Sequence, residues 1–182
     1  MSEQRVLGID PGSHRTGWGV VSLQGSRLLH VASGTIHAGE GSLAMRLRII
    51  GDVLDQVLLE HRPTVMAVET VFHARNAKSA LQLGHARGVA LLSAARRDLT
   101  VFEYTAGQIK QACTGRGRAD KDQVQQMVQI VLGVREPMGL DTSDALAAAI
   151  CHAHMASSAV TELLGAVNRQ GSVRMRARSI NG

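Results

Sequence analysis

The chain has 182 residues, of which 45% are hydrophobic and 19% charged, so we expect one folded domain of ordinary size rather than extensive disorder. No apolar run reaches the roughly 18 residues of a membrane helix, and two widely separated cysteines indicate a reducing, cytoplasmic setting. The net charge of +5 is weak evidence for nucleic acid, because residues 168–182 hold four arginines and no acid, leaving 16 basic against 15 acidic residues before them.

The first forty residues have the pattern of β-strands. Val6–Asp10 is a short apolar run that ends in an acid, and Gly17–Leu23 is a second apolar run. Gln24–Ser26 reads as a hairpin turn, which makes Arg27–His37 the third strand. The chain is therefore expected to open with an antiparallel meander.

The hydrophobic period then changes to that of helices. Apolar residues recur at helical spacing from Leu43 to Leu58, and Pro63 ends this predicted helix. Val65–Val68 is a short apolar strand, and a long helix is expected at about Asn76–Arg97.

The remaining pattern predicts one more strand and three more helices. Val101–Tyr104 is the fifth strand, and Gln108–Cys113 and Gln123–Leu132 are shorter helices. An Ala-rich helix is expected from Thr142 to beyond Met155.

Strands followed by alternating helices and strands favour an α/β fold, with a mixed five-stranded sheet covered by helices on both faces. Residues 1–167 are predicted to form this domain. Residues 168–182 are predicted to be a basic, disordered tail.

Four acids occupy positions from which they could meet. Asp10 and Glu69 each end an apolar strand, at the edge of a sheet where ligands bind in α/β folds. Asp141 and Asp144 lie three residues apart at the start of the last helix, hence on one face. Four carboxylates from three distant segments are thus expected on one side of the sheet.

Carboxylates that converge without compensation raise each other's pKa, and divalent cations remove that cost. Hard oxygen ligands suit Mg²⁺ or Mn²⁺. Two such ions, roughly 3.5–4 Å apart, stabilise both the attacking and the leaving oxygens of a phosphodiester displacement.

Each acid also has a structural interpretation. Asp141 can be a helix N-cap, Asp144 a partner of the helix dipole, and Asp10 a turn residue. Glu69 is the hardest to explain in this way, because it ends a strand without a turn residue beside it and strands disfavour Glu.

An ordered set of motifs resembles the RuvC Holliday-junction resolvases. The similarity runs from about Arg5 to Met155, in the order and spacing of that family. The motifs are LGIDPG at Leu7–Gly12, TGWGV at Thr16–Val20, AVETVF at Ala67–Phe72, NAKSALQLGHARGV at Asn76–Val89, FEYTAGQIKQ at Phe102–Gln111, GRGRADKDQV at Gly115–Val124 and DTSDALAAAICHAH at Asp141–His154.

The resemblance implies an RNase H-like fold and a homodimer that nicks two opposed strands of four-way junction DNA symmetrically, in recombination and repair. It implies a two-metal endonuclease with two Mg²⁺ per site, for which Mn²⁺ is a plausible substitute, and it implies the helicase-complex subunits RuvA and RuvB as partners. On this interpretation Asp10, Glu69, Asp141 and Asp144 match the catalytic metal-binding acids, although some members carry His at the position of Asp141.

The middle of the chain is basic. From Arg75 to Lys121 there are nine basic and three acidic residues, which supports nucleic acid better than the global charge does. The predicted DNA contacts are Phe72, Arg75, Asn76, Lys110, Arg116, Arg118 and Lys121. A solvated helix face is the alternative for the basic residues, and a core position capping the sheet is the alternative for Phe72.

Two other functions compete with a nuclease. A non-catalytic junction-binding module would share the basic surface but would not benefit from acids beside phosphate. An actin-like ATPase also opens with an acid and a glycine-bearing turn, but it needs two such domains, for which 182 residues are too few. Gly84 and Gly88 allow close helix packing, either in a dimer or against the chain's own sheet.

Overall fold

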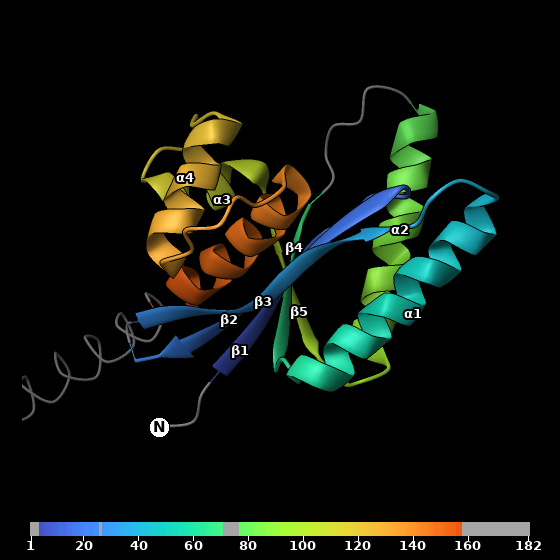
Figure 1. Ribbon diagram of the computed structural model, residues 1–182, viewed down its shortest axis with the longest axis horizontal. Coiled ribbons are helices and arrows are strands. Elements are labelled where there is room, and N and C mark those ends of the chain that lie inside the picture. The colour runs from blue at the N-terminus through green and yellow to red at the C-terminus, as the bar shows by residue number, and fades with distance from the viewer. Residues whose placement is uncertain (1–3, 26, 71–76, 158–182) are drawn as a thin grey trace, which may run out of the picture.

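A mixed five-stranded sheet forms the centre of the computed structural model, which describes residues 4–25, 27–70 and 77–157 (Figure 1). The strand order is β3-β2-β1-β4-β5, with β1, β2 and β3 antiparallel and β4 and β5 parallel to β1. The predicted meander and the mixed sheet are therefore confirmed. The strands are β1 (Gln4–Asp10), β2 (Arg15–Gln24), β3 (Arg27–His37), β4 (Val65–Glu69) and β5 (Thr100–Tyr104).

Helices cover both faces of this sheet, as predicted (Figure 1). One face carries α1 (Leu43–His61) and α2 (Ala77–Ala95), and the other carries α3 (Ala106–Thr114), α4 (Lys121–Leu132) and a last helix over residues 140–157. Among the described helices, none has the length and hydropathy needed to cross a membrane. The predicted tail lies outside the described residues, and its boundary stays a prediction.

Strand alternation divides the core into two clusters. In β1, Leu7 and Ile9 pack with α1 and α2, whereas Val6 packs with α3, α4 and the last helix. In β4, Met66 and Val68 belong to the first cluster and Ala67 to the second. The final residues of β1 and β4 therefore face the second cluster, because side chains alternate along a strand.

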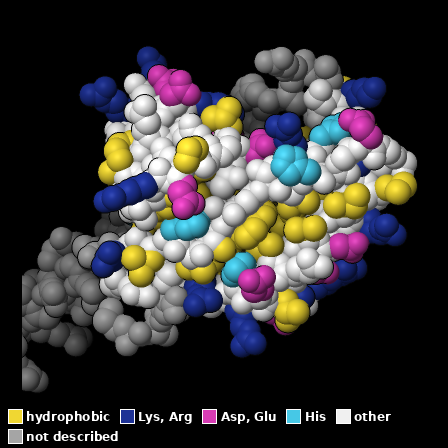
Figure 2. All heavy atoms as spheres, viewed as in Figure 1, with side chains coloured by type: hydrophobic (Ala, Val, Ile, Leu, Met, Phe, Trp, Pro, Cys, Tyr) yellow, Lys and Arg dark blue, Asp and Glu magenta, His cyan; other side chains and the backbone are white. Residues whose placement is uncertain are grey.

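On the face shown in Figure 2, hydrophobic side chains also gather between the β3 edge and α1.

Local capping explains where the short helices begin. Thr105 accepts a hydrogen bond from the backbone of Gln108, whose side chain accepts one from the backbone of Thr105, and this capping box starts α3 at Ala106, two residues before the predicted start. Asp120 and Gln123 form the same arrangement before α4. These caps place the first turns of α3 and α4 beside the ends of β1 and β4.

Glycines in β1 and β2 bring the last helix against the sheet. Gly8 pairs with Gly19, and a Cβ at Gly8 would overlap the backbone carbonyl of Ala145 in the helix. A Cβ at Gly17 would overlap the carbonyl of Asp141 in the same way. The helix therefore lies backbone against backbone on these strands, which no residue with a side chain would allow at this spacing.

We predict that Gly8→Ala destabilises the fold by about 1–3 kcal/mol or more, because the added methyl group must push the helix backbone away from β1. Gly107→Ala on α3 is the matched control, since its Cβ would lie 3.9 Å from the nearest neighbouring atom. Urea unfolding of both variants measures the difference. Equal stability of Gly8→Ala and the unsubstituted protein would show that the helix is not seated on the β1 backbone.

Candidate active site

Two parallel strands end side by side in acids. Asp10 is the last residue of β1 and Glu69 the last of β4, and the two strands pair up to Ile9 and Val68. Both acids follow residues that pack under α1 and α2, so their side chains point to the opposite face of the sheet, which carries the last helix.

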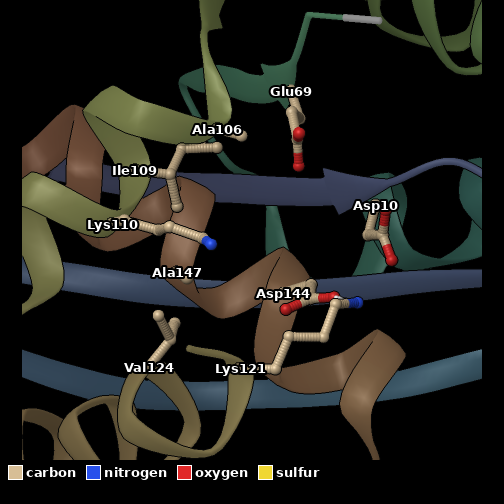
Figure 3. A pocket seen from close by; sticks show the side chains of 9 residues that line it. All are labelled: Asp10, Glu69, Ala106, Ile109, Lys110, Lys121, Val124, Asp144 and Ala147. Atoms are coloured by element: carbon tan, nitrogen blue, oxygen red, sulfur yellow. Dashed lines mark hydrogen bonds and ion pairs between the residues drawn. The ribbon is translucent and has the colours of Figure 1, made fainter. Parts of the chain in front are cut away.

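A cavity of about 290 Å³ lies at these strand ends (Figure 3). Asp144 enters it from the first turns of the last helix, Lys110 from α3 and Lys121 from the start of α4. The structure thus brings together five of the predicted site residues from five separate elements. The lining residues are Asp10, Glu69, Ala106, Ile109, Lys110, Lys121, Val124, Asp144 and Ala147.

Asp141 takes a different position from the other three acids. It is half-buried and is not among the residues that line the cavity, and its carbonyl lies over Gly17 in β2. Its charge nevertheless acts on the cavity, because it contributes to raising the pKa of Asp10. Asp141 therefore belongs to the electrostatic surroundings of the cavity.

The acids of the cavity carry an uncompensated negative charge. Burial, followed by repulsion from Asp144 and then from Glu69, raises the pKa of Asp10 from 3.8 to about 7. Burial, followed by repulsion from Asp144, also raises the pKa of Glu69. Lys121 lowers the pKa of both acids but does not offset burial and repulsion.

Lys121 is tied to one of these acids. Its Nζ donates a hydrogen bond to Asp144 Oδ2 at 3.0 Å, which forms an ion pair between two residues that line the cavity (Figure 3). This hydrogen bond, followed by the attraction of the Asp144 charge, raises the pKa of Lys121. Lys121 therefore holds the Asp144 carboxylate by a hydrogen bond, and it acts on Asp10 and Glu69 through its charge alone.

The donor set of the cavity fits a hard divalent cation in kind, because three carboxylates supply oxygen ligands and their mutual repulsion favours a compensating charge. In the part of the chain that the structure describes, no three acids, histidines or cysteines already stand close enough together to hold an ion. The ion pair between Lys121 and Asp144 satisfies one of the three carboxylates in this arrangement.

The predicted DNA contacts fall into three groups. Lys110 and Lys121 line the cavity, whereas Arg116 and Arg118 are exposed in the loop between α3 and α4. Phe72, Arg75 and Asn76 lie outside the described residues, and in the sequence they follow the cavity acid Glu69 by three, six and seven positions.

Sequence reasoning missed two polar contacts, one in the acid-bearing turn of the last helix and one in the loop after β1. Thr142, between Asp141 and Asp144, shares a hydrogen bond of 3.0 Å with the hydroxyl of Thr35 in β3. Arg46, in the first turn of α1, is only 6% exposed and donates to the carbonyl of Ser13 in the loop after β1. The position of Thr142 inside the acidic motif was an available signal, whereas Arg46 shows no sequence pattern that marks it as buried.

This sheet order, with acids at the ends of β1 and β4 and at the start of a helix laid across the strands, defines the class of RNase H-like nucleases. A family model described as crossover junction endodeoxyribonuclease RuvC matches residues 6–152. The chain belongs to the RuvC family of crossover junction endodeoxyribonucleases.

Individual relatives agree with this assignment. RuvC of Syntrophotalea carbinolica is 54% identical over 151 residues, which cover 82% of this chain and 94% of the relative. RuvC of Stutzerimonas stutzeri is 49% identical over 171 residues, which cover 93% and 98% of the two chains.

Solved structures extend the likeness to three dimensions. Thermus thermophilus RuvC in complex with a Holliday junction substrate has a TM-score of 0.80 at 34% identity, and the match covers 84% of this chain and 94% of that one. The yeast mitochondrial Holliday junction resolvase Ydc2 shares the fold with a TM-score of 0.60 at 13% identity. The predicted family, fold and enzyme class are therefore confirmed.

We predict that Asp10→Asn stabilises the metal-free protein at pH 8 by on the order of 2 kcal/mol. Folding raises the pKa of Asp10 from 3.8 to about 7, so the unsubstituted protein loses folding stability as pH rises through that window. Asn carries no charge, so the variant does not lose stability in this way. The gain should shrink towards pH 4, where Asp10 is protonated in the folded state.

Thermal unfolding in EDTA across this pH range measures the effect. Asp52→Asn, on the exposed side of α1, is the control and should change stability little at either pH. A loss of stability at pH 8 in Asp10→Asn would contradict the proposed repulsion.

Proposed function

We propose that this chain cleaves four-way DNA junctions, nicking two opposed strands symmetrically, with Asp10, Glu69 and Asp144 as the ligands of Mg²⁺. The observation that carries the proposal is the meeting of these three acids with two lysines in one cavity, in a chain of the RuvC family. A structural relative solved with a Holliday junction substrate supports the choice of DNA.

The half-buried carboxylates of the cavity would hold the cation. Bound Mg²⁺, or Mn²⁺ in its place, would lower the pKa of a water that attacks the scissile phosphate and would stabilise the departing 3′-oxygen. Two ions per site agree with four nearby acids, of which Asp141 would contribute from beside the cavity. The products would be a 5′-phosphate and a 3′-hydroxyl.

The basic residues would meet the DNA backbone. Lys110 and Lys121 stand at the cavity, where a scissile phosphate must come, and the exposed Arg116 and Arg118 extend the positive surface along the loop between α3 and α4. Such contacts release counterions, so junction binding should weaken as salt increases. Phe72 would stack on an unpaired base at the branch point, and Arg75 and Asn76, which follow it in the sequence, would complete the proposed interface.

A homodimer would supply the two active sites that paired cuts require. The exposed side of α2 carries a stripe at helical spacing, in which Leu81 is 63% exposed and Leu92 51% exposed. Gly84 and Gly88 lie between these leucines, and a Cβ at either glycine would meet open space, so they do not seat α2 on its own sheet. The stripe would therefore let a second copy of α2 approach closely.

Family resemblance and cysteine chemistry suggest the remaining partners and the location. Junction-binding and helicase subunits of the RuvA and RuvB kinds follow from family resemblance. A cytoplasmic location agrees with the two cysteines, Cys113 and Cys151, which are both buried and free.

Cleavage of a synthetic four-way junction and of a matching linear duplex, each with Mg²⁺ or with EDTA, tests the activity. Asp10→Asn should bind the junction and fail to cut it, because a neutral amide binds Mg²⁺ poorly and removes one ligand. Asp52→Asn is the matched control and should keep both binding and cleavage.

Cutting by Asp10→Asn at the unsubstituted rate would contradict the assignment of this acid. Junction binding by the unsubstituted protein without any cutting in Mg²⁺ would favour a non-catalytic junction-binding module. Equal cutting of junction and duplex would exclude structure selectivity.

Replacing both Leu81 and Leu92 with Glu should convert the dimer to a monomer, since charge on the stripe cannot be desolvated between two helices. Light scattering should then report the mass of one chain, 19.4 kDa, in place of twice that mass. Leu59→Glu on α1 is the control, because Leu59 is also 63% exposed and lies on a different helix. A double variant that remains dimeric would place the interface elsewhere.

A further inference from the structure

A row of paired residues crosses three neighbouring strands under the first turns of the last helix. Asp10 in β1 pairs with Gly17 in β2, and Gly17 pairs with Thr35 in β3. Residues paired in this way across antiparallel strands project to the same face of the sheet. That face carries the last helix, so the row forms a floor beneath its first turns.

The acid-bearing turn of the helix contacts this floor at two points. The carbonyl of Asp141 lies directly over Gly17, where any Cβ would overlap it. The hydroxyl of Thr142 shares a hydrogen bond of 3.0 Å with the hydroxyl of Thr35, across 107 positions of sequence. Thr142 is only 8% exposed, so water competes little for this bond.

The contacts oppose a force that acts on the same turn. Asp10, Glu69 and Asp144 repel one another, and this repulsion favours movement of the helix start away from the end of β1. Close packing at Gly17 sets the height of the turn above the sheet, and the bond between Thr35 and Thr142 limits its sliding along the sheet.

We propose that Gly17, Thr35 and Thr142 are positioning residues that fix the start of the last helix, and with it Asp141 and Asp144, relative to Asp10, and thereby set the affinity of these acids for a divalent cation. None of the three lines the cavity, so their action on the site is assigned through the acids that they position. The inference rests on the proposed function of the acids as metal ligands. On this inference, the hydrogen bond between the hydroxyls of Thr35 and Thr142 strengthens cation binding by the acids, although it touches none of their carboxylates.

The test measures cation affinity in the full-length protein without DNA. Isothermal titration with MnCl₂ should show about three- to tenfold weaker binding for Thr142→Val, which removes the hydroxyl and keeps the shape of the side chain. Thr142→Ser keeps the hydroxyl and should bind Mn²⁺ as the unsubstituted protein does. Thr35→Val and Thr35→Ser should repeat this pattern from the other side of the bond.

Two further readouts separate positioning from general stability. The double variant Thr35→Val and Thr142→Val should bind Mn²⁺ no more weakly than either single Val variant, because one shared bond is lost in all three. Thr64→Val is the matched control. The Thr64 hydroxyl donates a hydrogen bond of 3.1 Å to the carbonyl of Arg5, and neither residue lines the cavity. It should keep its Mn²⁺ affinity whatever its change in stability.

In junction cleavage, the Mg²⁺ concentration that gives half the maximal rate should rise for the Val variants, while junction affinity in EDTA stays unchanged. Unaltered Mn²⁺ affinity in a folded Thr142→Val would overturn the inference and leave the proposed function standing. If Thr142→Val does not fold, Thr35→Val decides in the same way. Absence of cation binding and of cleavage in the unsubstituted protein would overturn the proposed function, and this inference with it.

Discussion

The active site depends on one contact, the seating of the last helix on the bare backbone of β1 and β2. Gly8 and Gly17 have no side chains to hold the helix away, and the helix presents alanines, among them Ala145 and Ala149, to the same strands. A helix that packed through larger side chains would stand farther from the sheet. The distance between an acid on a strand end and an acid on this helix is therefore set by backbone packing, which is stiffer than any pair of flexible side chains.

This seating brings like charges together, so the rest of the fold must supply the free energy that holds them there. Hydrophobic clusters on both faces of the sheet do so, and β1 contributes to both, with Leu7 and Ile9 on one side and Val6 on the other. The raised pKa of Asp10 is the local sign of the opposing electrostatic cost. A site that favours a cation in this way is less stable without one, which is the usual relation between preorganised function and stability.

Much of this arrangement could be predicted from local patterns. The bounds of β3 agree with the sequence prediction at both ends, and the acids at the ends of β1 and β4 meet because parallel neighbours end at the same edge of a sheet. The bond between Thr35 and Thr142 could not be predicted, because it depends on the register of β2 against β3 and on the depth at which the helix sits. The burial of Arg46 depends in the same way on the loop that follows β1, whose path no local pattern specifies.

The distribution of charge connects the cavity to its substrate. Residues 75–121 carry a net charge of +6, while the three cavity acids and Asp141 lie outside that segment. A phosphate in the cavity would be attracted by Lys110 and Lys121 and repelled by the carboxylates, of which Asp144 is paired with Lys121. On the proposed function, cations bound by the acids would cancel this repulsion at the point of cleavage. Cation binding and productive DNA binding are then thermodynamically linked, since each reduces a charge that opposes the other, and linkage of this kind acts equally in both directions.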